Sequence, residues 1–255
     1  MAAQKDREFR EILNNADLAI PDSSRLGLSY WLLRKSRLER LLFWPLFLLP
    51  TKVVMQFDVV TGTDFMEALC KVAAEKGFTA GFLGGKEGVA KKTAECLRKK
   101  YPKLKVVFTE SGGEVSYEGQ WSGSFDHKAP RARPDRSLRV GFAPYDNSVI
   151  QSGLRETAPV ALIGSNFAIP SVDILFVAFG HIKQEKWIAK NLDKIPAHVA
   201  MGVGGAFDYL SGGVSRAPKL MRDLGLEWLF RLIVQPWRIG RQLSLFRYLW
   251  LIVLD

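Results

Sequence analysis

Cysteine and histidine are scarce in this chain of 255 residues, which contains two cysteines and three histidines. Cys70 and Cys96 form no Cys-x-x-Cys pair, so the sequence offers no zinc-type ligand spacing. Two buried thiols in a cytosolic protein are the interpretation that we favour. Acidic residues are outnumbered by basic ones, and the net charge is +10. This balance favours polyanionic partners without choosing among nucleic acid, anionic lipid and phosphorylated ligands.

A hydrophobic run long enough to cross a bilayer is also missing. The longest run, residues 41–49 (LLFWPLFLL), is interrupted by Pro45 and is shorter than the roughly 20 residues of a spanning helix. The first residues (MAAQKD) lack the apolar region of a signal peptide, so we expect a cytoplasmic protein. Apolar residues make up 47% of the chain and charged residues 24%, which predicts a folded globular protein.

Strands and helices alternate along the chain, with glycine at several junctions. The apolar runs at 173–179 and 199–203 are continuous, which is typical of parallel strands buried on both faces. We therefore predict an α/β fold, a Rossmann-like parallel sheet flanked by helices. The expected strands are 78–83, 104–108, 173–179 and 199–203, with weaker candidates at 138–143 and 159–164; the expected helices are 5–19, 61–77, 89–100 and 182–192.

Two domains are expected from the changes in composition. Residues 1–215 are predicted to form the core, with insertions at 25–58 and 110–137, and residues 216–255 a helical appendage. The appendage interleaves arginine with tryptophan and phenylalanine, which suits a helix at the surface of an anionic membrane. A packed helix pair and a nucleic-acid-binding surface are the alternatives on composition alone.

Glycine-containing turns follow three of the expected strands, at the sheet edge where ligands bind in open α/β folds. Glycine lets the backbone approach a phosphate closely, and Asp208 can accept hydrogen bonds from sugar hydroxyls. None of the turns is a P-loop or a complete Gly-x-Gly-x-x-Gly fingerprint, and each alone is equally compatible with a plain turn. The turns contain Gly84 and Gly85, then Gly180, then Gly204 and Gly205.

The order of these motifs is more specific than any one of them. The segments DILFVAFGHIKQEKWIAKN, AMGVGGAFDYLSGGVSRAP and GLEWLFRLIVQPWRIGR resemble the WecG/TagA/CpsF glycosyltransferases (glycosyltransferase family 26). The family pattern includes Lys-Gln-Glu-x-Trp, Gly-Val-Gly-Gly-x-Phe-Asp and Arg-Ala-Pro. The earlier segments ILNNADLAIPD, TGTDF and FLGGKEGVA are also similar, so the resemblance covers most of residues 3–109 and 171–247.

The resemblance implies inverting transfer of an N-acetylmannosamine-type sugar from a UDP donor to a polyprenyl-diphosphate-linked acceptor, in the synthesis of cell-surface polysaccharide. It makes Asp22 the general base, Gln184 a catalytic contact to sugar or phosphate, and the glycine turns with Asp208 the nucleotide site. No metal, cofactor or nucleic acid is expected. The protein would act at the inner face of the plasma membrane, on an anionic surface, and a homo-oligomer is compatible with this. The arginines implied to hold the diphosphate are Arg216, Arg231, Arg238 and Arg241.

The sequence also departs from the family pattern, mostly on the side of the acceptor and the base. Met1 falls at an internal point of the pattern, with no counterpart of the family's first strand. Pro-Asp-Gly reads Pro21-Asp22-Ser23, Val59 replaces an arginine, and Gly180-His181-Ile182 replaces a Gly-Pro turn. Two alternatives therefore stay open: a catalytically impaired relative that binds nucleotide sugar or lipid and, more weakly, a Rossmann oxidoreductase.

Overall fold

The computed structural model describes two compact units. The larger unit comprises residues 6–16 and 63–214, and the smaller unit comprises residues 1–5, 17–62 and 215–255. The structure describes residues 2–20, 32–43, 60–111, 113–122, 161–162, 168–223, 226–234 and 236.

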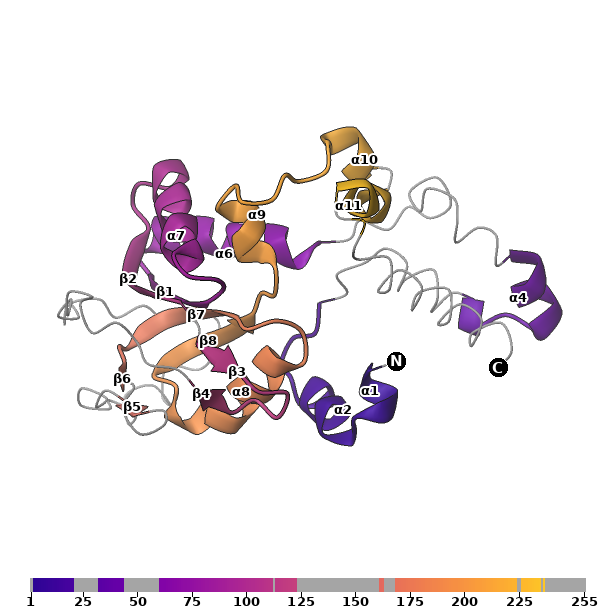
Figure 1. Cartoon of the computed structure of the whole chain (residues 1–255), viewed down its shortest axis with the longest axis horizontal. Helices are drawn as coiled ribbons and strands as arrows, with labels where there is room; N and C mark the ends of the chain where they lie inside the picture. The colour runs from indigo at the N-terminus through magenta and orange to yellow at the C-terminus, as the bar shows by residue number, and fades with distance from the viewer. Residues whose placement is uncertain are drawn as a thin grey trace, which may run out of the picture. The chain divides into compact units, whose positions relative to one another are not determined.

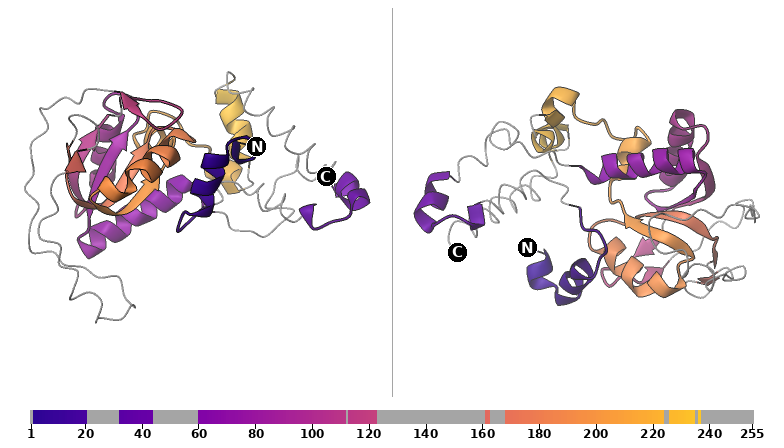
Figure 2. Two further views of the ribbon diagram at one scale, coloured as in Figure 1. Left: turned by 90° about the horizontal axis from the view of Figure 1, so that it is seen from below. Right: turned by 180° about the vertical axis from the view of Figure 1, so that it is seen from behind.

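The larger unit is built on a four-stranded parallel sheet with the strand order β2-β1-β7-β8 (Figures 1 and 2). β1 and β7 are the central strands, and Ala80 pairs with Ile174. At the start of β1, the backbone N–H and the hydroxyl of Thr79 both donate to Asp173, each at 2.7 Å. The predicted parallel α/β fold is confirmed. The strands are β1 (Thr79–Gly84), β2 (Lys105–Glu110), β7 (Val172–Ala178) and β8 (Ala197–Gly202).

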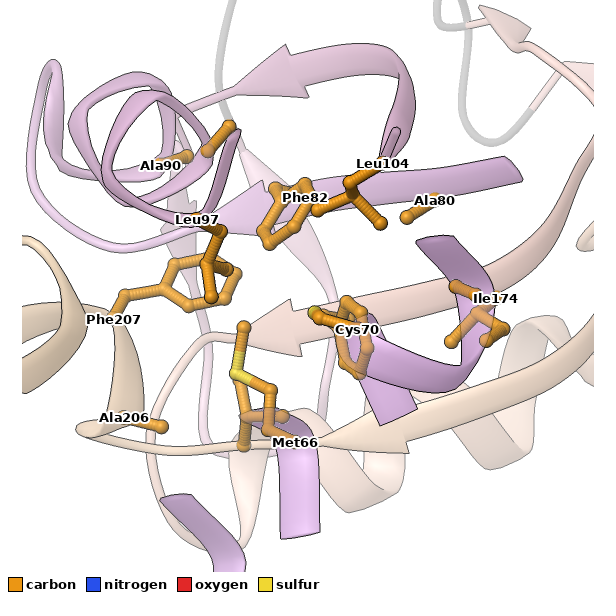
Figure 3. Close-up of a cluster of buried hydrophobic side chains, with 14 of the residues drawn as sticks. Met66, Cys70, Ala80, Phe82, Ala90, Leu97, Leu104, Ile174, Ala206 and Phe207 are labelled. Carbon is orange, nitrogen blue, oxygen red and sulfur yellow. The ribbon is translucent and has the colours of Figure 1, made fainter. Parts of the chain in front are cut away.

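Helices cover both faces of this sheet, because successive side chains of its strands point to opposite sides. Phe82 and Phe176 belong to the buried cluster on one face, where the ring centroid of Phe207 in α9 lies 5.7 Å from that of Phe82. Figure 3 shows Phe82 and Phe207 in this cluster. On the other face, Leu175 and its neighbours pack against Trp187 of α8. The first face is covered by α6 (Gly62–Lys76), α7 (Val89–Lys100) and α9 (Ala206–Leu210). The second face is covered by α8 (Lys183–Asn191) and by β3 (Glu114–Val115), which pairs with β4 (Trp121–Ser122).

β8 differs from the sequence-based prediction, which treated residues 199–203 as a buried strand. β7 is buried along almost its whole length, but Val199 in β8 is 40% exposed. β8 lies at an edge of the described sheet, so it has only one neighbouring strand there. The two cysteines also differ from one another: Cys70 is buried and Cys96 is half-buried, so the expectation of two buried thiols holds for Cys70 alone.

Short helices and one pair of short strands make up the remaining regular structure of the described residues. The helix expected at 5–19 is shorter, since α2 begins after Asp6, whose side chain accepts a hydrogen bond from the Phe9 N–H at 2.9 Å. Of the weaker strand candidates, 138–143 lies outside the described residues and 159–164 contains β5. Within the described part of the chain, no helix is both long and apolar enough to span a membrane. The remaining elements are α1 (Ala2–Lys5), α2 (Arg7–Asn14), α4 (Arg37–Phe43), β5 (Ala161–Leu162), β6 (Ala168–Ile169), η2 (Leu192–Lys194), α10 (Lys219–Asp223) and α11 (Glu227–Val234).

Candidate active site

The glycine turn after β1 packs closely against the end of β7. The N–H of Gly85 donates to the carbonyl of Ala178 at 2.9 Å. A Cβ atom on Gly84 would lie 2.8 Å from the same carbonyl group, and Gly84 has a φ of +107°. Only glycine fits such a position without displacing the backbone. The first two predicted ligand-site glycines therefore have a structural reason to be there, and they lie at the carboxyl end of the central strands.

The turn after β7 is strained and open. Gly180 has a φ of +91°, and a Cβ atom there would meet no heavy atom within 4 Å. Ile182, at the start of α8, has φ +74° and ψ −48°. It is the one non-glycine residue with positive φ in the described part of the chain. A β-branched residue in this region is a genuine outlier that costs about 1–3 kcal/mol, and such strain clusters at functional sites.

Gln184 joins the turn after β7 to the turn after β8. Its side chain is buried, and its Oε1 accepts a hydrogen bond from the Gly204 N–H at 2.9 Å. Its Nε2 donates to Oε1 of Glu185, also at 2.9 Å. A Cβ atom on Gly202 would lie 2.8 Å from that Nε2, so the amide fits only beside a glycine. Gln184 thus fixes the position of the Gly204 backbone at the predicted nucleotide site.

The other carboxylate oxygen of Glu185, Oε2, is buried and has no hydrogen-bond partner. Among the described residues it is the only buried side-chain polar atom without one. Sequence reasoning missed Glu185, although it belongs to the quoted Lys-Gln-Glu motif. The motif pointed to this segment of the sequence, but the burial of Glu185 Oε2 without a partner is apparent only in the structure.

Asp208 lies beside the same turn, in the first turn of α9. Its Oδ2 is 4.0 Å from the place of a Cβ atom on Gly205. Phe207 next to it is buried, and its carbonyl accepts a hydrogen bond from the Thr93 hydroxyl of α7 at 3.0 Å. The fold therefore brings Gln184, Gly204, Gly205 and Asp208 together at the carboxyl edge of the sheet.

An ion-pair cluster that the sequence did not reveal fixes α2 to α8. The ammonium of Lys186, whose side chain is 4% exposed, lies 2.7 Å from Asp6 Oδ2 and 2.8 Å from Glu8 Oε2. The Tyr117 hydroxyl donates to Asp6 at 2.9 Å, and its ring centroid lies 4.6 Å from the ammonium. The Lys186 hydrogen bond, helped by the Phe9 N–H, lowers the pKa of Asp6 to about 2. The hydrogen bonds of Lys186 to Asp6 and to Glu8 raise the pKa of the ammonium.

This cluster lies close to the turn after β7. Phe9 of α2 is buried, and its ring makes an edge-to-face contact with His181, with centroids 5.3 Å apart. Lys186 is two residues from Gln184 on α8, so the two side chains point to different sides of the helix. The first turn of α8 is thereby held by α2 on one side and by the turn after β8 on the other.

The predicted acceptor-side residues are not part of this described arrangement. Asp22, Arg238 and Arg241 lie outside the described residues, and the side chain of Arg231 in α11 is outside them too. Arg216 is half-buried in the smaller unit, where it donates to the Thr61 hydroxyl at 3.2 Å. The roles of these residues stay predictions. Within the described ranges, no three His, Cys, Asp or Glu side chains gather in a way that could hold a metal ion.

Comparison with known proteins identifies relatives of this chain. Residues 44–121 and 168–255 match the family described as Glycosyl transferase WecG/TagA/CpsF. The chain is also similar to the N-acetylglucosaminyldiphosphoundecaprenol N-acetyl-beta-D-mannosaminyltransferase of Bacillus subtilis (strain 168), with 27% identity over 247 residues. That alignment covers 97% of this chain and 72% of the relative. The family match includes the four strands of the sheet, α8 and α9, which confirms the resemblance drawn from the sequence motifs.

Proposed function

Since the chain belongs to the WecG/TagA/CpsF family of glycosyl transferases, we propose that it transfers an N-acetylmannosamine-type sugar from a UDP donor, with inversion, to a polyprenyl-diphosphate-linked acceptor. The name of the Bacillus subtilis relative supports the class of sugar and of acceptor. The observation that carries the proposal is the joining of the glycine turns after β7 and β8 by Gln184, next to Asp208.

The donor would bind at the carboxyl edge of β1, β7 and β8. Backbone N–H groups of the glycine turns can approach a diphosphate there, and Gly180 leaves free space at the end of β7. Asp208 supplies a carboxylate that accepts hydrogen bonds from hydroxyl groups of the nucleotide or the sugar. Because Gln184 holds the Gly204 backbone in place, this edge is organised before a ligand arrives.

Catalysis would depend on residues that approach from the acceptor side. Asp22 would take the proton from the acceptor hydroxyl as it attacks the anomeric carbon. The departing UDP gains negative charge in the transition state, which nearby cations stabilise without a metal ion. Guanidinium groups suit this because their planar fork binds phosphate oxygens bidentately. The arginines that we assign to this role are Arg216, Arg231, Arg238 and Arg241.

The test is sugar transfer from UDP-N-acetylmannosamine to polyprenyl-diphosphate-linked N-acetylglucosamine in detergent. Asp22→Asn should lower turnover about 10²–10⁴-fold, because general-base catalysis contributes an effect of that size. The affinity for UDP should be unchanged. Asp17→Asn, which alters an exposed carboxylate nearby in the sequence, is the matched control and should leave turnover unchanged.

Three outcomes would contradict parts of the proposal. A normal rate in Asp22→Asn would remove Asp22 as the base. Calorimetric binding of UDP by the wild type without any transfer would instead favour the alternative of a catalytically impaired nucleotide-sugar-binding relative. Transfer that stops in EDTA and returns with a divalent cation would show that the reaction needs a metal ion.

A further inference from the structure

The buried oxygen of Glu185 calls for a hydrogen-bond donor. Folded proteins leave few buried polar atoms unpaired, because the loss of a hydrogen bond to water is not offset. Glu185 Oε1 is paired with the Gln184 amide, but Oε2 has no partner, although it is buried. A carboxylate loses more than a neutral group in such a position. This atom therefore lacks a hydrogen-bond donor, which a bound ligand can supply.

The orientation of this carboxylate is fixed by its neighbour. The Gly204 N–H can only donate, so it faces the Gln184 oxygen and turns the Gln184 NH₂ group toward Glu185. The close approach of Gly202 leaves the amide little room to move. The carboxylate is thus linked through one side chain to the backbone of Gly204. Glu185 lies in the first turn of α8, which follows the open turn at Gly180.

The chemistry of the carboxylate restricts what it can bind. An ionised carboxylate accepts hydrogen bonds and donates none, and it repels phosphate. A UDP-sugar carries neutral donors of the required kind: the hydroxyl groups of the ribose, and the hydroxyl groups and amide N–H of the sugar. We propose that Glu185 Oε2 accepts a hydrogen bond from such a neutral group of the sugar nucleotide, with Gln184 as the residue that positions the carboxylate. This inference rests on the proposed function.

Calorimetric titration of the full chain with UDP and with UDP-N-acetylmannosamine tests the proposal. Glu185→Gln keeps the size of the side chain but can present an NH₂ group where the ligand also has a donor. We expect about 10–100-fold weaker binding of the ligand that carries the donor group, the usual effect of losing a hydrogen bond to a charged group. Equal losses for both ligands would assign the donor to the nucleotide, and a loss for the UDP-sugar alone would assign it to the sugar.

Two further variants isolate the cause. Glu95→Gln changes an exposed glutamate in α7, outside the glycine turns, and should bind both ligands normally. Gln184→Met keeps the volume of the side chain but removes both of its hydrogen bonds, so it should weaken binding of the same ligand as Glu185→Gln does. A positioning role predicts this shared selectivity, which a general loss of packing would not produce.

The outcomes separate this inference from the proposed function. If the wild type binds and transfers the sugar while Glu185→Gln binds both ligands with normal affinity, the inference is wrong and the proposed function stands. Weaker binding accompanied by a lower melting temperature would show that Glu185 is structural, and this too would overturn the inference. If the wild type binds neither ligand, the proposed function fails, and the inference fails with it.

Discussion

Ile182 combines a β-branched side chain with a backbone conformation that such residues rarely adopt. Ile182 lies between β7 and α8, the helix that contains Gln184 and Glu185, and has a φ of +74°. The family pattern has proline in this turn, where φ is restricted to about −65°. The backbone between β7 and α8 therefore cannot have the conformation that proline imposes at this position. The positive φ of Ile182 is the strained part of this connection.

Replacing Ile182 by glycine should relieve this strain. Ile182→Gly should be about 1 kcal/mol more stable than Ile182→Ala, because both variants lose the side chain but only alanine keeps the Cβ that conflicts with positive φ. Urea denaturation monitored by tryptophan fluorescence measures the difference, provided that the dependence on urea is the same for both variants. Equal stability of the two variants would show that the Ile182 backbone is not strained.

At the scale of elements, ion pairs hold α2 to α8, and no strand of the sheet contributes a residue to them. Buried ion pairs often stabilise a protein no more than apolar side chains would, but they fix the geometry of docking. We therefore regard the cluster of Lys186, Asp6, Glu8 and Tyr117 as the contact that fixes the position of α2 on α8.

The pH dependence of this contact follows from the pKa of Asp6, which the fold lowers from 3.8 to about 2. A lowered pKa stabilises the folded state above about pH 4, and this contribution is lost as the pH falls from about 4 to about 2. Lys186→Met removes the main cause, so the pKa of Asp6 should rise toward its ordinary value. Carbon-detected NMR titration of the Asp6 carboxyl group measures it.

Lys190→Met is the matched control for this titration, because Lys190 pairs with Glu8 at 3.4 Å and has no ion pair with Asp6. It should leave the Asp6 titration near that of the wild type. If the Asp6 midpoint stays near pH 2 in Lys186→Met, the ammonium does not hold the carboxylate. The Phe9 N–H and the Tyr117 hydroxyl would then be its main partners.

Local patterns in the sequence predicted the four strands of the parallel sheet, but not their order within it. The helix predicted at 89–100 has the same bounds as α7, and the strand predicted at 173–179 lies one residue from β7. The exposure of β8 was missed, because an apolar run does not show whether a strand lies at the centre or the edge of a sheet. The contact between Asp6 and Lys186 was missed because no local pattern links residues so far apart in the sequence.

Local patterns in the sequence also predicted part of the candidate site. Glycine at strand ends and the quoted motifs identified the turns that the fold brings together around Gln184. They did not show that the Gln184 amide bonds to protein atoms or that Glu185 has an unpaired oxygen, since both depend on the packing of α8 against β8. The strain at Ile182 was likewise invisible, because φ is set there by the strand and helix on either side.

For the whole molecule, the net charge of +10 and the lipid-linked acceptor that we propose predict binding to anionic membranes. Each basic residue near such a surface contributes about 1 kcal/mol, and salt screens this attraction. Sedimentation with vesicles should show binding when they contain phosphatidylglycerol and not when they contain phosphatidylcholine alone. Affinity should fall about 10-fold or more between 0.1 and 0.5 M NaCl.

A pair of charge reversals locates the contact. Arg238→Glu with Arg241→Glu should reduce binding to anionic vesicles strongly, because we assign the membrane contact to the C-terminal segment. Lys91→Glu with Lys92→Glu makes the same change of charge on the exposed face of α7 and should have a smaller effect. Equal losses in the two double variants would mean that total charge, and not the C-terminal segment, attracts the membrane.

The central pair of strands also has a consequence for how the chain can vary. β1 and β7 are adjacent, but Thr79 and Asp173, which form a hydrogen bond near the start of the two strands, are 94 positions apart. Closing a flexible loop costs an entropy that grows with the logarithm of its length, about 0.6 kcal/mol for each doubling. Through this term, a change in the number of residues between β4 and β5 should have little effect on the free energy of unfolding. The length of this segment should instead affect the rate of folding, because contacts between residues that are far apart in the sequence form slowly.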